Sequence, residues 1–150
     1  MTATILILNG PNLNLLGERE PEVYGRETLT DIEEACRAKA DELGLAVDFR
    51  QSNSEAEIVE LIQKSRRQVA GIIVNAGALS HTSIAILDAL QAVEVPVIEV
   101  HLSNIFRRES FRRRSYVSRA ATGVICGLKG HGYVLAIEAL ARLHKSKGGA

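Results

Sequence analysis

A long polar segment between residues 9 and 24 carries several side chains that could take part in chemistry. It follows the apolar run Ile5–Leu8 and includes Asn12, Arg19 and Tyr24. Compact α/β domains usually connect a strand to a helix with about two to six residues, so a longer connection is expected to hold or cover a ligand. Tyrosine becomes a base only when a cation stabilises its phenolate, and Arg19 can be that cation. The alternative is that Tyr24 anchors the loop by packing, which these residues alone favour.

Glu99 and His101 form a second candidate group. They lie two positions apart on a predicted strand, so their side chains point the same way. A carboxylate beside an imidazole favours the imidazolium ion and orients its ring, which prepares a general acid. A structural ion pair that closes the strand explains the same residues equally well.

Polar residues follow every predicted strand. In chain order they are Asn9 and Asn12, Ser52 and Asn53, Asn75, Glu99 and His101, and Lys129. Because ligands of open parallel sheets bind beyond the carboxyl ends of the strands, we expect Asn12, Asn75 and His101 at one rim. Ser52 and Asn53 are interpreted as ordinary polar strand ends.

His81 and Asp88 are weaker candidates. His81 is predicted to open a helix, and Asp88 then lies about two turns along the same stripe. A polar cap is the alternative for His81, and a solvated helix residue is the favoured interpretation of Asp88 alone.

A cluster of arginines follows the fourth predicted strand. Its members are Arg107, Arg108, Arg112, Arg113 and Arg114. Arg108 and Arg112 are four apart and would share a helix face that can pair with a carboxylate or with hydroxyls. Arg113 and Arg114 are interpreted as a solvated face. Nucleic-acid binding is the alternative, but few aromatic residues are interleaved and the net charge is zero.

The elements that must position these residues alternate along the chain. Apolar runs predict strands at Ile5–Leu8, Leu45–Gln51, Gly71–Val74, Val95–Val100 and Val124–Cys126. Helices are predicted from Thr28 to Gly44 with a capping box at Thr30–Glu33, from Ser54, around Ile84–Leu90, and over Tyr133–His144, with a helical turn in 104–114 and a frayed end over 146–150. This pattern predicts an α/β flavodoxin-like three-layer fold, in which a five-stranded parallel sheet of order 2-1-3-4-5 has helices on both faces.

Composition excludes several classes of protein. The 150 residues suit one domain, taken as 1–150, and 18 basic residues balance 18 acidic ones, so the chain has no overall charge that would recruit nucleic acid or an acidic membrane. Cys36 and Cys126 are expected to be buried free thiols. The chain has no membrane-span pattern, signal peptide, phosphate-binding glycine motif or metal-ligand spacing, so we expect a cytoplasmic protein whose acid–base site uses no cofactor and no metal.

Taken together, these residues resemble the type II 3-dehydroquinate dehydratases. The shared motifs are Asn9–Gly17, Arg19–Pro21 with Tyr24–Gly25, Asn75–Ala78 with Ser80–Thr82, and Glu99–Asn104. The match continues through Arg108–Glu109, Phe111–Arg112, Ser115–Tyr116 and 123–133, so it covers essentially the whole chain in order.

The resemblance implies removal of water from 3-dehydroquinate by anti elimination through an enolate. It implies that Tyr24 takes the C2 proton and that Arg19 keeps Tyr24 ionised. Asn12 would hold the water that stabilises the enolate oxygen, and His101, oriented by Glu99, would protonate the leaving C1 hydroxyl.

The resemblance also implies substrate-binding residues and an assembly. Leu102 and Ser103 would meet the carboxylate, and Asn75, His81 and Arg112 would bind the carboxylate or ring hydroxyls. Asp88 would reach a neighbouring subunit's site, since the family forms dodecamers built from trimers. The pathway served is either aromatic biosynthesis or quinate breakdown.

Some residues depart from the family pattern or lack an assigned role. Lys129 stands where we expect glycine, and Arg107, Arg113 and Arg114 make the cluster more basic. Arg108 is given only a supporting role. The competing hypothesis is a non-catalytic flavodoxin-like module that binds an anion or a flavin phosphate at the same rim.

Overall fold

Five parallel strands form one sheet in the order β2-β1-β3-β4-β5, which confirms the predicted topology. The computed structural model describes residues 2–148. The strands are β1 (Thr4–Asn9), β2 (Ala46–Gln51), β3 (Gly71–Asn75), β4 (Val97–His101) and β5 (Gly123–Cys126). The α-helices are α1 (Pro21–Tyr24), α2 (Leu29–Glu42), α3 (Glu55–Lys64), α4 (Ile84–Gln91) and α5 (His131–Gly148). Short 3-10 helices are η1 (Leu13–Leu15), η2 (Gly77–His81), η3 (Ile105–Arg107), η4 (Ser110–Arg112) and η5 (Val117–Arg119).

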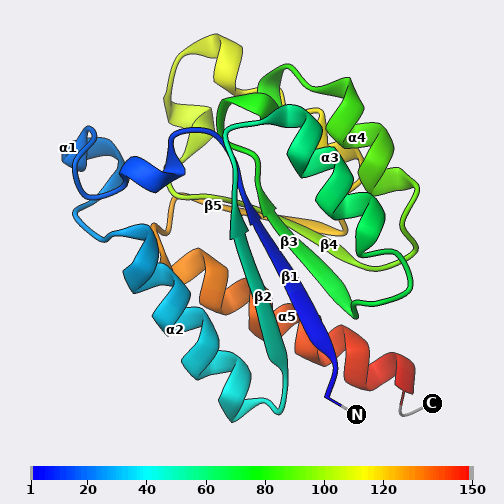
Figure 1. Cartoon of the computed structure of the whole chain (residues 1–150). Helices are drawn as coiled ribbons and strands as arrows, with labels where there is room; N and C mark the ends of the chain where they lie inside the picture. Colours follow the sequence, from blue (N-terminus) through cyan, green and yellow to red (C-terminus); the bar gives the residue numbers. More distant parts are fainter. Residues whose placement is uncertain (1, 149–150) are drawn as a thin grey trace.

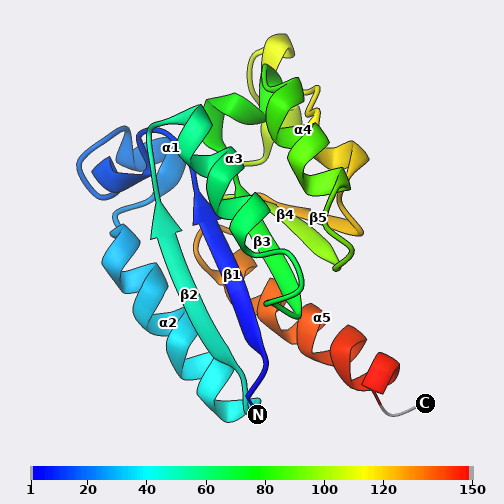
Figure 2. The ribbon, with the colours of Figure 1, turned by 45° about the vertical axis from the view of Figure 1, so that its right-hand side comes forward.

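Helices cover both faces of the sheet and give the three-layer, flavodoxin-like arrangement. Helices α2 and α5 lie on one face and α3 and α4 on the other, as Figures 1 and 2 show from two directions. Along β1, Ile5 and Ile7 belong to the core cluster with α2 and α5, while Leu6 and Leu8 belong to the cluster with α3 and α4. Successive strand residues face opposite sides, so a strand buried on both faces must be apolar throughout.

The register of the sheet brings the polar strand ends together. Asn9 of β1 pairs with Asn75 of β3, and His101 of β4 pairs with Cys126 of β5. All strands are parallel, so these residues share the carboxyl edge of the sheet. In Figure 1, α1 and its flanking loops lie beyond this edge, while the start of β1 and the end of α5 lie at the opposite one.

The predicted bounds of β4 and α5 were wrong, and α5 begins at His131 rather than Tyr133. Strand β4 begins at Val97 rather than Val95, because Pro96 has no N–H to donate to the ladder. Residues 146–148 continue helix α5 instead of fraying. The remainder of that predicted frayed end, 149–150, lies outside the described residues.

The start of helix α4 also differs from the prediction. Its N-cap is Ser83, whose Oγ accepts a hydrogen bond of 2.9 Å from the N–H of Ile86. His81 therefore ends η2 instead of opening the helix. As a result, His81 and the exposed Asp88 of α4 do not share one helical stripe.

The capping box of α2 lies two residues earlier than predicted. The Thr28 hydroxyl accepts from the Asp31 N–H at 3.1 Å, and the Asp31 carboxylate accepts from the Thr28 N–H at 3.0 Å. The predicted box at Thr30–Glu33 was wrong, because Thr30 already lies inside the helix, where its N–H is no longer at the cap. Helix α1, a single turn inside the long loop, was not predicted.

Both cysteines are free thiols, but only one is buried. Cys36 has no exposed surface, and burial raises its pKa to about 12, so it stays protonated and inert. Cys126 is half-buried, which corrects the expectation for that residue.

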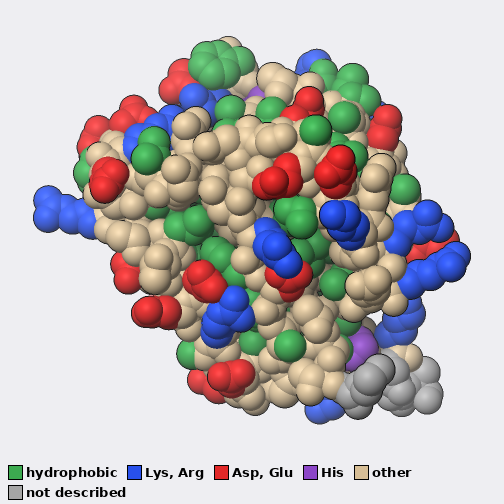
Figure 3. Space-filling view, viewed as in Figure 1, with side chains coloured by type: hydrophobic (Ala, Val, Ile, Leu, Met, Phe, Trp, Pro, Cys, Tyr) green, Lys and Arg blue, Asp and Glu red, His purple; other side chains and the backbone are tan. Residues whose placement is uncertain are grey.

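Two further features of the molecule are the length and apolar character of its helices and the distribution of charge on its surface. Within residues 2–148, no helix is long and apolar enough to cross a membrane. On the face shown in Figure 3, basic and acidic side chains are interspersed rather than gathered by sign.

We predict that the substitution Thr28→Ala lowers the free energy of unfolding by about 1 kcal/mol, because it removes the side-chain acceptor of the cap. Thr30→Ala is the matched control, since Thr30 is an exposed threonine of the same first turn. It should change stability by a few tenths of a kcal/mol at most. Urea denaturation of both variants measures the difference, and equal losses would contradict the observed cap.

Candidate active site

A small cleft lies at the carboxyl edge of the sheet, where the loops after β1, β3 and β4 meet the long first loop. Its lining residues are Pro11, Asn12, Leu13, Arg19, Tyr24, Asn75, Gly77, Ala78, His81, His101, Leu102, Ser103, Ile105, Arg108 and Arg112. Every predicted site residue lines this cleft except Glu99 and Asp88. Glu99 is buried behind the cleft, and Asp88 is exposed on α4.

A wider, open groove of about 1250 Å³ runs between the ends of α2 and α5. Leu43, Leu143 and charged helix residues such as Glu138 and Arg142 line it. It contains none of the predicted site residues, and it lies away from the carboxyl edge, where ligands of open parallel sheets bind. The smaller cleft is therefore the candidate site.

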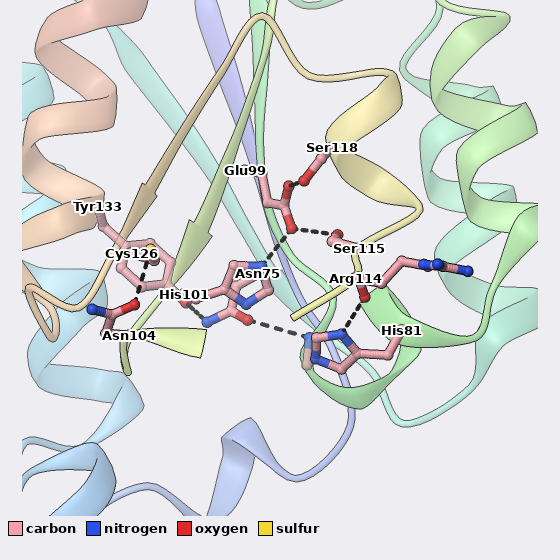
Figure 4. A network of polar contacts seen from close by, with 11 residues as sticks. Asn75, His81, Glu99, His101, Asn104, Arg114, Ser115, Ser118, Cys126 and Tyr133 are labelled. Carbon is pink, nitrogen blue, oxygen red and sulfur yellow. Dashed lines mark hydrogen bonds and ion pairs between the residues drawn. The ribbon is translucent and has the colours of Figure 1, made fainter. Parts of the chain in front are cut away.

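His101 is held from behind by the carboxylate of Glu99. Both residues lie on β4, and Glu99 has no exposed surface. Glu99 accepts hydrogen bonds from the His101 Nε2, from the Ser115 Oγ at 2.6 Å and from the Ser118 Oγ (Figure 4). Burial alone would raise the pKa of the Glu99 carboxyl, but these hydrogen bonds hold it below its usual value. An ionised Glu99 can only accept a hydrogen bond, so His101 Nε2 carries a proton. His101 Nδ1 is then the ring nitrogen that Glu99 does not hold.

His81 lies beside His101, but the two rings carry a proton on different nitrogens. The two rings are stacked with centroids 6.2 Å apart. His81 Nδ1 lies 2.8 Å from the carbonyl oxygen of Arg114, which can only accept, so Nδ1 carries the proton. Burial lowers the pKa of His81, and the neighbouring charge of Arg112 lowers it further. A neutral His81 presents Nε2 as an acceptor, which suits a hydroxyl of a ligand.

A buried tyrosine fixes the asparagines at the floor of the cleft. Tyr133 of α5 has no exposed surface, and its hydroxyl donates to Asn9 Oδ1 at 2.7 Å while it accepts from Asn75 Nδ2 at 2.9 Å. Asn75 Oδ1 accepts from the Gly77 N–H at 3.2 Å. Burial raises the pKa of Tyr133, which keeps it a neutral donor. An amide NH₂ has two hydrogens, so Asn75 retains one N–H for a ligand.

Asn12 is set by backbone geometry. It adopts a left-handed conformation with a φ of 71°, and its N–H donates to Asn53 Oδ1 at 3.0 Å. Asn53 also accepts from Gln51 Nε2 at 3.2 Å. The interpretation of Asn53 as a plain strand end was therefore incomplete, whereas the hydroxyl of Ser52 accepts from the nearby N–H of Ser54.

Two arginines flank Tyr24, and only one of them bonds its hydroxyl. Arg108 Nη1 donates to the Tyr24 oxygen at 2.9 Å. The guanidinium carbons of Arg19 and Arg108 lie 5.0 Å and 5.2 Å from the centroid of the tyrosine ring. Both distances are within the range of cation–π attraction. Arg108, which the sequence left with a supporting role, thus makes the direct contact.

Arg108 and Arg112 reach the cleft by separate routes. The predicted shared helix face was wrong, because Arg108 is extended between η3 and η4 while Arg112 ends η4. Glu109 pairs with both guanidinium groups. Arg107 is exposed on the surface and does not line the cleft.

Lys129 occupies a backbone position that favours glycine. Its φ is 52°, in the left-handed region, which explains why glycine is expected there. Its N–H donates to the Leu102 carbonyl at 3.0 Å, and its side chain lies against Gly25. The next N–H, from Gly130, donates to the Glu27 carboxylate at 3.1 Å. The turn before α5 therefore joins the end of β4 to residues 19–28, the segment that carries Arg19 and Tyr24 and is called the lid below.

The sequence pointed to neither Tyr133 nor the two serines on Glu99 as site residues. Tyr133 resembles an ordinary apolar residue at the start of a helix, and Ser118 an ordinary surface serine. Ser115–Tyr116 and the segment 123–133 belong to the motifs shared with the family, but these motifs assigned no role to Ser115 or Tyr133.

The chain also matches known proteins in sequence and in fold. Residues 3–141 match the family described as Dehydroquinase class II. The chain is 58% identical to the 3-dehydroquinate dehydratase of Methylobacterium radiotolerans, over 98% of this chain and 99% of the relative. It is 58% identical to 3-dehydroquinate dehydratase 2 of Pseudomonas aeruginosa, over 92% and 93%. The crystal structure of type II dehydroquinase from Propionibacterium acnes superposes with a TM-score of 0.91 at 45% identity, covering 95% of this chain and 98% of that one.

We predict that Tyr133→Phe lowers the free energy of unfolding by about 1–3 kcal/mol, because Asn9 and Asn75 are left with unsatisfied buried groups. Tyr116→Phe is the matched control, since the Tyr116 hydroxyl makes no hydrogen bond with the other described side chains or backbone groups of residues 2–148. Thermal and chemical denaturation compare the two variants. An unchanged stability in Tyr133→Phe would show that the network does not hold the cleft floor.

Proposed function

The chain belongs to the class II dehydroquinase family, and we propose that it removes water from 3-dehydroquinate to give 3-dehydroshikimate. The observation that carries the proposal is that one cleft holds both a group suited to act as a base and a group suited to act as an acid. Tyr24 is flanked by two arginines, and His101 is backed by a buried carboxylate. No cofactor is needed for this chemistry, and residues 1–150 would act as one catalytic domain.

In the first step, Tyr24 removes the proton from C2, which is acidic because it is next to the C3 ketone. The Arg108 hydrogen bond and the charge of Arg19 stabilise the phenolate form that accepts this proton. Closure of the lid over the substrate would exclude water and strengthen both attractions. Arg19 acts through its charge at the ring, while Arg108 acts at the oxygen.

The electron pair released from C2 moves onto the ketone oxygen and forms an enolate. Asn12 is suited to hold the water that stabilises this oxygen, because it lines the cleft and its side chain makes no hydrogen bond with residues 2–148. A donor fixed where charge develops lowers the barrier without reorganisation.

In the second step, the enolate reforms the ketone while the C1–O bond breaks, which leaves a double bond between C1 and C2. Hydroxide is a poor leaving group, so His101 donates a proton and the group departs as water. Glu99 accepts from Nε2, so Nδ1 is the nitrogen that can face the departing hydroxyl. Tyr24 has gained one proton and His101 has lost one, and exchange with solvent restores both.

The remaining cleft residues would bind the substrate. The Leu102 N–H and Ser103 would meet the carboxylate, and Arg112 can pair with a carboxylate or with hydroxyls. Neutral His81 would accept from a ring hydroxyl, and Asn75 would donate its free N–H. Each of these side chains lines the cleft.

The assembly and setting are also proposals. Asp88 is exposed on α4 and outside its own cleft, so it is free to reach the site of a neighbouring subunit. We propose a dodecamer built from trimers, in the cytoplasm. The product would serve either aromatic biosynthesis or quinate breakdown.

We expect the purified protein to convert 3-dehydroquinate into a product with the ultraviolet absorption of a conjugated enone. Tyr24→Phe should lower kcat by about a hundredfold to ten-thousandfold, since it removes the base. Tyr116→Phe, outside the cleft, should keep full activity. Full activity in Tyr24→Phe would exclude Tyr24 as the base, and an inactive intact protein would support a binding module instead.

We further expect Arg108→Gln to lower kcat by about tenfold to a hundredfold, the loss that corresponds to one charge-assisted hydrogen bond. The exposed Arg107 one residue earlier is the matched control, and Arg107→Gln should leave kcat unchanged. Steady-state kinetics of both variants give the comparison. Equal effects would mean that overall basic charge matters, rather than the contact with Tyr24.

A further inference from the structure

The carboxylate of Glu99 receives hydrogen bonds from two serines that do not line the cleft. Ser115 Oγ donates to Oε2 at 2.6 Å, and Ser118 Oγ donates to Oε1. Both serines come from the segment between η4 and the end of η5. Figure 4 shows Glu99 lying between His101 and these two hydroxyls.

The three donors around Glu99 select its charged form. An ionised carboxylate only accepts hydrogen bonds, so it satisfies His101 and both serines at once. A protonated carboxyl would direct its own O–H at one of these donors. Burial opposes the charge, and hydrogen bonds to the charged form are what offset that cost.

We propose that Ser115 and Ser118 are positioning residues, which keep Glu99 ionised and fixed so that it holds the His101 ring and its Nε2 proton. The inference rests on the proposed role of His101 as the acid. It assigns the serines no contact with substrate, because neither one lines the cleft.

The segment that carries the serines also positions the second histidine. The Arg114 carbonyl oxygen accepts from His81 Nδ1, and Arg112 of η4 lines the cleft. One stretch of chain thus holds Glu99 through side chains and His81 through its backbone. Alanine at 115 and 118 removes only the first of these functions.

Several other titratable groups lie on the cleft side of Glu99 and His101, besides Cys126 of β5, which pairs with His101 in the sheet. The groups on the cleft side are His81 of η2, Arg112 of η4, Arg108 between η3 and η4, and Arg19 and Tyr24 of the loop before α2. None of them donates a hydrogen bond to Glu99 within residues 2–148, so the serine substitutions leave these contacts in place.

Loss of the serine hydroxyls has a defined effect on pH dependence. Both hydroxyls lower the pKa of Glu99 against the effect of burial, so their removal raises it. The ionised carboxylate is the form that orients His101. Its protonation as the pH falls would therefore begin at a higher pH in the variant, and the acidic limb of kcat would move upward.

The test is the double variant Ser115→Ala/Ser118→Ala, with a readout that needs no substrate. Carbon-13 NMR of labelled glutamate follows the Glu99 carboxyl during a pH titration, and its resonance is assigned by its absence in Glu99→Gln. We expect the Glu99 pKa to rise by about one pH unit or more. In kinetics, kcat should fall by about tenfold to a hundredfold with the acidic limb shifted upward, while KM changes less than about threefold.

Matched controls separate positioning from a general loss of packing. Ser65→Ala removes a serine hydroxyl that donates to the Ile62 carbonyl at 2.7 Å far from the cleft, and it should change neither readout. Ser115→Thr keeps a hydroxyl, so the Glu99 carboxyl of this variant should titrate nearly as it does in the intact protein. The single variants Ser115→Ala and Ser118→Ala are titrated as well, so that the question is answered even where the double variant fails to fold.

The outcomes distinguish this inference from the proposed function. A Glu99 titration and an acidic limb unchanged in folded variants would overturn the positioning role. An intact protein that does not dehydrate 3-dehydroquinate would overturn the proposed function, and the carboxyl titration would still decide whether the serines hold Glu99 ionised.

Discussion

The carboxylate of Glu99 lies inside the protein with no exposed surface, and a buried charge is tolerated only when it is fully hydrogen-bonded. Its side chain lies on the same side of β4 as Val97, which packs in the cluster with α3 and α4. The chain between β4 and β5 must therefore fold back on that side to bring Ser115 and Ser118 to the carboxylate. As it does so, it carries Arg112 into the cleft and the Arg114 carbonyl to His81.

A second buried network holds the opposite side of the same edge. The Tyr133 hydroxyl ties helix α5 to Asn9 and Asn75, which are paired across β1 and β3. Tyr133, Asn9 and Asn75 are all buried, and Glu99 is the buried centre of the first network, so the two networks make a rigid floor. The lid is held differently. The Tyr24 hydroxyl accepts a hydrogen bond from Arg108. The turn at 127–130 supports the end of the lid through the N–H of Gly130 and the side chain of Lys129. A fixed floor under a separately attached cover suits chemistry that must admit a substrate and then exclude water.

Much of the fold was predictable because it depends on patterns that are local in sequence. Continuous apolar runs revealed strands buried on both faces, and the mixed strand Ala46–Gln51 revealed the edge. Polar residues at strand ends then converged, since parallel strands share one carboxyl edge. Predictions failed where two neighbouring residues could serve the same purpose. Thr28 and Thr30 are both possible caps, and only the backbone geometry selects Thr28.

By itself, the sequence determined the order of the strands and the rim at which the candidate residues meet, because hydrophobic periodicity and parallel pairing leave few alternatives. Only the tertiary structure decided which side chains touch. Arg19 is near Tyr24 in the chain, yet the hydrogen bond comes from Arg108, 84 residues away. The serines on Glu99 and the tyrosine under Asn75 look ordinary in sequence. Their importance arises from burial, since a buried polar group must find a partner wherever the fold supplies one, and spacing along the chain carries no record of that choice.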